Sequence, residues 1–103
     1  MIVRTWHGCV PREYAEGFAR HLHKTGVEHA RATPGNKAAF VHQETQGEWQ
    51  HFFLATYWED LTAVKKFAGE NYHVAVTWPD DKAFALVSDP YVFQHQVSEI
   101  VPL

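Results

Sequence analysis

The chain has 103 residues, which is the length of one ordinary domain and too short for two. Hydrophobic residues make up 46% of it and charged residues 20%, and no low-complexity tract interrupts it, which excludes a disordered chain. Nine basic and twelve acidic residues give a net charge of −3, so the chain lacks the basic surface that nucleic-acid binding requires. We therefore expect one domain over residues 1–103 that binds no nucleic acid.

The same composition gives no sign of a membrane or secreted protein. The apolar run "HFFLATYW" (51–58) is far too short to cross a bilayer, and the first fifteen residues lack the charged start and apolar core of a signal peptide. Cys9 is the single cysteine and cannot form an internal disulfide, in agreement with a reducing compartment. We expect a cytoplasmic protein with no membrane segment.

The first half of the chain predicts a strand, a helix and a hairpin. Residues 2–10 contain β-formers and end at Pro11, and over 12–25 apolar side chains recur every four residues until Gly26, which predicts a helix that stops there. A polar connection, "EHARATPGN", follows. The runs "KAAFVHQE" and "EWQHFFLATYW", joined by "TQG", then predict a long β-hairpin.

The second half predicts a helix, an uncertain segment and a strand. Asp60 can cap a short helix whose apolar residues share one face, and Gly69 follows as its end. Residues 70–77 fit a strand or a helix by periodicity, the segment "KAFALVSDP" is irregular, and 91–101 reads as a last strand.

This order of elements predicts an α+β fold of the ferredoxin-like, split βαββαβ kind, an antiparallel sheet with helices on one face. The side chains on both faces of the third strand are bulky: Phe53 and Tyr57 lie on one face, and Phe52 and Trp58 lie on the other. Since the helices can cover only one face, we expect a second copy on the other, which gives a homodimer through the sheets.

Eight histidines invite a metal site, but their spacing does not support one. His21 and His23 face different directions on a helix, which suggests surface residues rather than a zinc site. If Gln46 and Gly47 are the centre of the hairpin turn, His42 lies opposite His51, and that pair could bind a metal, pass a proton or simply stack. No glycine-rich strand-to-helix turn for flavin or nicotinamide occurs either.

Five stretches in order, "RTWHG", "TPGN", "HFFLATYW", "FAGE" and "WPDDKAFAL", resemble the antibiotic biosynthesis monooxygenase family. The resemblance spans nearly the whole chain and implies a dimeric α+β barrel. It also implies a helix over 71–77. Haem-degrading relatives carry an axial histidine late in that helix, where this chain has Thr77.

In such relatives the cavity lies between sheet and helices, and matching the first strand puts Thr5, His7 and Cys9 on that side. The resemblance thus makes His7 a site candidate and Trp6 a dimer-core candidate, unless a bulge at Gly8 changes the phase.

The implied chemistry is oxidation of an electron-rich phenol or quinol by O2 without haem, flavin or metal. It needs an apolar slot and a group that accepts the phenolic proton. The proton acceptor would be one of the histidines His7, His51 and His73. The slot would be lined by Trp58, Phe67, Tyr72 and Trp78, although a core position is the stronger reading for Trp58. The alternatives are a non-catalytic dimeric module that binds a small ligand or acts in a stress response and, less favoured, a haem-degrading enzyme.

Overall fold

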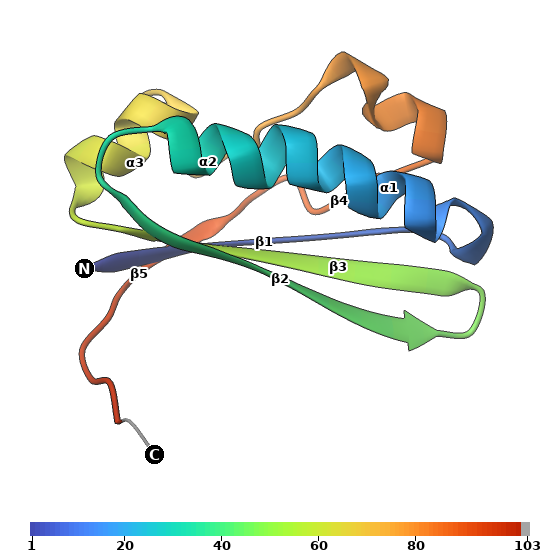
Figure 1. Ribbon diagram of the computed structural model, residues 1–103, viewed down its shortest axis with the longest axis horizontal. Helices are drawn as coiled ribbons and strands as arrows, with labels where there is room; N and C mark the ends of the chain where they lie inside the picture. The colour runs from blue at the N-terminus through green and yellow to red at the C-terminus, as the bar shows by residue number, and fades with distance from the viewer. Residues whose placement is uncertain (102–103) are drawn as a thin grey trace.

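A computed structural model describes residues 1–101 and shows a five-stranded antiparallel sheet with its helices on one face (Figure 1). The strands are β1 (Ile2–Pro11), β2 (Asn36–Gln46), β3 (Trp49–Trp58), β4 (Val87–Ser88) and β5 (Phe93–Gln96). The helical segments are η1 (Arg12–Tyr14), α1 (Ala15–Leu22), η2 (His23–Val27), α2 (Glu28–Ala32), α3 (Leu61–Ala68) and η3 (Pro79–Phe84). The predicted ferredoxin-like α+β class is confirmed.

Strand β1 is central: it pairs with β3 on one side and with β4 and β5 on the other. The pairing with β3 runs without interruption from Ile2 to Pro11, so no bulge occurs at Gly8. The face of β3 toward the helices is buried, with Phe52 and Trp58 inaccessible to solvent, while Phe53 on the other face is 40% exposed. None of the helices among residues 1–101 is long and apolar enough to cross a membrane.

The predicted end of the first helix at Gly26 was wrong. The chain passes through a π-helical turn, η2, and continues as α2 to Ala32. Gly26 is buried against β3, where a Cβ would lie 2.9 Å from a methyl carbon of Leu54, so close packing rather than termination explains the glycine. Helix α2 ends where Pro34 forces Thr33 into an extended conformation.

The hairpin is confirmed, but its predicted turn was one residue out. Gly47 and Glu48 form the centre, with Gly47 at φ +58°, because the tight hairpin turns favour a glycine with positive φ at the first central position. His42 therefore lies opposite Phe53, and His51 lies opposite Glu44. The predicted His42–His51 pair does not form.

Two predictions for the C-terminal third were also wrong. Residues 71–77 are not helical, because their backbone bonds to the segment after β4: the N–H of Ala75 donates to Pro90 O and the N–H of Val92 donates to His73 O. The last strand is shorter than expected, since β5 covers only 93–96, and "KAFALVSDP" contributes the short strand β4. By contrast, α3 begins at the Asp60 cap as predicted, with the carboxylate accepting from the Ala63 N–H.

Candidate functional site

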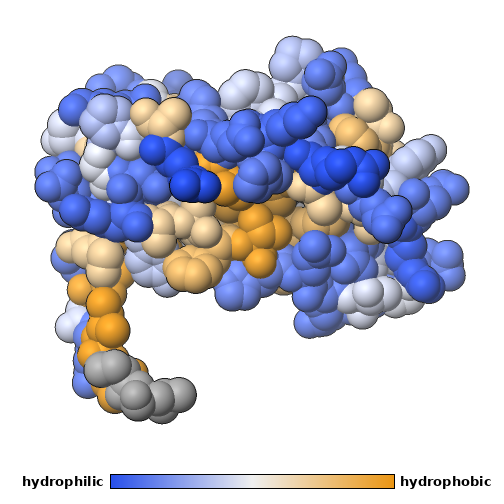
Figure 2. All heavy atoms as spheres, viewed as in Figure 1, coloured by the Kyte–Doolittle hydropathy of each residue, from blue (hydrophilic) through white to orange (hydrophobic). Residues whose placement is uncertain are grey.

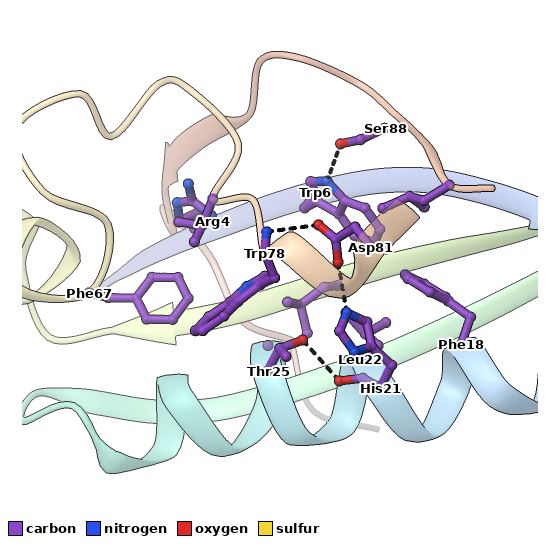
Figure 3. A pocket seen from close by; sticks show the side chains of 14 residues that line it. Arg4, Trp6, Phe18, His21, Leu22, Thr25, Phe67, Trp78, Asp81 and Ser88 are labelled. Atoms are coloured by element: carbon purple, nitrogen blue, oxygen red, sulfur yellow. Dashed lines mark hydrogen bonds and ion pairs between the residues drawn. The ribbon is translucent and has the colours of Figure 1, made fainter. Parts of the chain in front are cut away.

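A narrow pocket lies between the sheet and the helices, with room of about 40 Å³. Four aromatic side chains line it: Trp6, Phe18, Phe67 and Trp78. Three ionisable side chains also reach it, Arg4 from β1, His21 from α1 and Asp81 from η3 (Figure 3). In the space-filling view apolar side chains reach the surface in the middle of the molecule, between the helical layer and the sheet (Figure 2). Aromatic walls with a few convergent polar groups are typical of small-molecule sites.

His21 and Asp81 form the shortest polar contact at the pocket. His21 Nε2 donates to Asp81 Oδ1 over 2.7 Å, and both side chains are more than four-fifths buried. The other oxygen, Oδ2, accepts from the Trp78 N–H at 2.9 Å. A carboxylate bound to one nitrogen of an imidazole fixes its tautomer and leaves the other nitrogen as a proton acceptor.

Arg4 is a buried cation. In the view of Figure 3 it lies on one side of Trp78, and the His21–Asp81 pair lies on the other. Its residue is 3% exposed, and burial lowers the pKa of its guanidinium to about 10. The guanidinium carbon lies 5.5 Å from the centre of the Phe67 ring, within cation–π range.

Trp6 forms the wall on the side of the sheet. Its indole N–H donates to Ser88 Oγ at 2.8 Å, and its ring lies over Gly8, where a Cβ would meet ring carbon Cζ2 at 2.5 Å. The absence of a side chain at Gly8 therefore allows the Trp6 indole to lie flat on the strand.

A second hollow, of about 450 Å³, lies on the open face of the sheet. His7 is one of the residues that line it: its Nδ1 lies 3.1 Å from Asp89 Oδ2, and its Nε2 lies 2.8 Å from His51 Nδ1. The His7 ring is also stacked on Phe53, with 4.8 Å between ring centres. This hollow is wider than the pocket but lies on an uncovered surface.

The structure reverses the predicted sides of the first strand. Trp6 faces the helices and lines the enclosed pocket, and His7 faces the open side, as do its strand neighbours Thr5 and Cys9. The reversal places Arg4 on the pocket side, since it lies two residues before Trp6. The expectation that His7 lies between sheet and helices was wrong.

The other candidate residues are divided between the pocket and the rest of the molecule. Phe67 and Trp78 line the pocket. Trp58 and Tyr72 belong to the packed cluster around α3, where Trp58 is fully buried. His73 is exposed on the irregular segment, with its ring centre 4.5 Å from that of Tyr72. The pocket therefore contains none of the three predicted histidines.

Sequence reasoning missed three of the polar residues at the pocket. His21 was expected on the surface, and neither Asp81 nor Arg4 was among the candidate residues. A signal existed for His21, because it lies three residues after Phe18 and one before Leu22, at the edge of the buried helix stripe. Nothing local marks Asp81, which comes from a segment far along the chain.

No family model and no curated protein matches this chain in sequence. Solved structures match over nearly its whole length. A candidate antibiotic biosynthesis monooxygenase from Deinococcus radiodurans superposes with a TM-score of 0.66 at 17% identity, covering 100% of this chain and 98% of that one. The chain has the antibiotic biosynthesis monooxygenase fold.

Other structures with this fold carry different chemistry. The haem-degrader MhuD from Mycobacterium tuberculosis matches with a TM-score of 0.65 at 17% identity, over 99% of this chain and all of that one. SnoaB from Streptomyces nogalater, a cofactor-independent oxygenase, matches with a TM-score of 0.56 at 18% identity, over 99% and 98% of the two chains. The shared fold therefore leaves the reaction open, and the pocket must decide it.

The residues of this pocket do not fit haem. The one histidine that lines it, His21, is already hydrogen-bonded to Asp81 through Nε2. Thr77, which the resemblance matches to the axial histidine, offers no imidazole and is exposed. Within the described part of the chain, no three His, Cys, Asp or Glu side chains converge to hold a metal ion.

Proposed function

We propose that this chain is a cofactor-independent monooxygenase that oxidises a small phenol or quinol with O2 in the pocket between its sheet and helices. The observation that supports it is the His21–Asp81 pair, a proton acceptor with its orienting carboxylate, set among aromatic walls. The fold shared with a cofactor-independent oxygenase makes this reaction class the natural candidate.

The proposed reaction needs little from the protein. A deprotonated phenol supplies the electrons itself: one oxygen atom of O2 enters the ring to give a quinone, and the other leaves as water. His21 accepts the phenolic proton, and Asp81 holds the imidazole and stabilises its charged form. We assign this role to His21 rather than to His7, His51 or His73, because those three lie outside the pocket.

The test is a screen of phenols and quinols for oxygen uptake, followed by His21→Ala. We expect the variant to lose about a hundredfold or more of the rate, as removal of a general base does. His23→Ala is the matched control, because His23 lies on the same helical run with its side chain 58% exposed. Equal rates for His21→Ala and the wild type would contradict the assignment.

A second candidate function is a binding module without catalysis. It is favoured by the small free volume of the pocket, because a bound phenol alone needs less room than a phenol together with O2. A phenol that saturates the pocket without any oxygen uptake would support the module and refute the oxygenase.

We also propose that the active unit is a homodimer. The open face carries exposed aromatic side chains from three strands or their flanks, Phe40, Phe53, Tyr91 and Phe93. Residues 97–101, which follow β5, run away from the body on that side of the sheet (Figure 1), with Ile100 and Val101 among the most exposed apolar residues. A second copy would cover both features.

A further inference from the structure

Arg4 is a buried cation without a counter-charge. It is 97% buried, and none of the ion pairs among residues 1–101 includes it. Its Nε has no hydrogen-bond partner, and Nη2 has only two long bonds, to the carbonyl oxygens of Tyr72 at 3.4 Å and Val74 at 3.2 Å. A desolvated charge in this state is costly unless a ligand completes its environment.

The surroundings of Arg4 define what such a ligand would be. The guanidinium lies against the Phe67 ring, with Trp78 beside it in Figure 3, and Trp6 lines the same pocket. A planar guanidinium donates two parallel N–H bonds to a carboxylate or one strong bond to a phenolate. Aromatic walls add favourable contact with a flat ring.

We propose that this pocket binds a planar aromatic oxyanion, whose charged oxygen accepts hydrogen bonds from Arg4 and whose ring packs against Phe67 and Trp78. The inference rests on the proposed function for the position of the site and names its substrate class. The oxyanion is either a ring carboxylate, which leaves the phenolic oxygen of the same ligand free to face His21, or a phenolate that is already ionised when it binds. Both present a negatively charged oxygen to Arg4.

Binding of a ring requires the pocket to open. An apolar cavity of about 150 Å³ holds benzene, several times the present room of about 40 Å³. We expect residues 71–78, which lie outside the helices and strands, to move, because η3 is held against α1 by the His21–Asp81 bond and by the packing of Phe84 on Phe18. Helix η3 ends at Ala85, whose backbone is in the left-handed region at φ +51°.

The experiment titrates the full chain with benzoate and 4-nitrophenolate, as the carboxylate and phenolate forms. Benzamide is the neutral shape match and inorganic phosphate is the non-aromatic anion. Tryptophan fluorescence reports binding, because Trp6 and Trp78 line the pocket. The NMR resonance of the Arg4 Nε–H reports the contact directly in the wild-type chain, so the test does not depend on any variant folding.

We expect benzoate or 4-nitrophenolate to bind at least about tenfold more tightly than benzamide and phosphate, and to shift the Nε–H resonance of Arg4. Whichever of the two binds better identifies the form of the oxyanion. Arg4→Met should lose this preference, while the control Arg20→Met, at an exposed position of α1, should keep it.

Three results would overturn the inference: no saturation by either anion, equal binding of benzoate and benzamide, or an unmoved Arg4 resonance at saturation. Failure of the oxygenase proposal is distinct from these. Tight, Arg4-dependent binding without any oxygen uptake would leave the oxyanion site in place and refute only the reaction.

Discussion

His21 on α1 and Asp81 on η3 are joined by a hydrogen bond of 2.7 Å although 60 residues separate them in the chain. The same carboxylate accepts the Trp78 N–H through its other oxygen. Asp81 therefore both caps the start of η3, by accepting the Trp78 N–H, and binds η3 to α1. This bond and the packing of Phe84 on Phe18 together hold η3 against α1.

Asp81→Asn should lower the free energy of unfolding by about 1–3 kcal/mol, because it replaces a charge-assisted hydrogen bond with a neutral one at a largely buried position. Urea unfolding followed by tryptophan fluorescence measures the loss. Glu28→Gln is the control, since Glu28 pairs with His23 over 3.5 Å on the exposed surface, where such pairs contribute little. Equal losses in the two variants would contradict the role given to Asp81.

Phe40→Glu should weaken the proposed dimer. Phe40 is 54% exposed on β2 and lies opposite Ala55 on the open face. A buried, unpaired carboxylate at a sheet-to-sheet contact would be costly, so we expect sedimentation to shift from dimer toward monomer. The neighbouring Val41→Glu is the matched control, because adjacent residues of a strand point to opposite faces. A wild-type chain that sediments as a monomer at micromolar concentration would refute the dimer itself.

The fold could be predicted from sequence because its signals are local. The Asp60 cap, the helical period after it and Gly69 at φ +83° lie within ten residues, and the hairpin is marked by Gly47 between two apolar runs. Segment 71–77 was harder, because its conformation depends on backbone bonds to 90–92 and on the Arg4 side chain, which come from distant parts of the chain.

The site was predicted less well, for a physical reason that concerns Arg4 and Trp6. The two share a face of β1, and a charged residue normally marks the solvent side of a strand. The sides of β1 were assigned from the family resemblance, and the charge of Arg4 would not have corrected them, because here the cation is buried with the indole. Such violations of local preference are expected where a residue is retained for binding rather than for stability.

Cys9 should react slowly with thiol reagents near neutral pH. Burial and the negative charge of Asp89 raise the pKa of its thiol, and the thiolate is the reactive form. Asp89→Asn removes the second cause, lowers the pKa and should increase the alkylation rate, as followed by mass spectrometry. Asp80→Asn, at an exposed position of η3, should leave the rate unchanged. Identical rates for all three proteins would show that Asp89 does not act on Cys9.

Arg4→Met should leave the ligand-free protein at least as stable as the wild type at pH 7. Methionine preserves much of the packing volume while removing a desolvated charge, and such replacements of buried charges are often neutral or stabilising by about 1–4 kcal/mol. Loss of the bonds to the Tyr72 and Val74 carbonyls opposes this gain, but both bonds are long. Urea unfolding of the two proteins measures the difference.

The difference in unfolding free energy between the wild type and Arg4→Met should change with pH in a defined direction. Burial lowers the pKa of Arg4 to about 10 in the folded chain, well below its ordinary value, so above pH 10 the unfolded chain binds more protons at this position than the folded one. The wild type should therefore gain stability relative to Arg4→Met as pH rises from 9 to 11, and the difference should be constant between pH 6 and 8. A relative loss of wild-type stability over pH 9–11 would mean that the folded state stabilises the charged guanidinium, and that Arg4 already has its counter-charge.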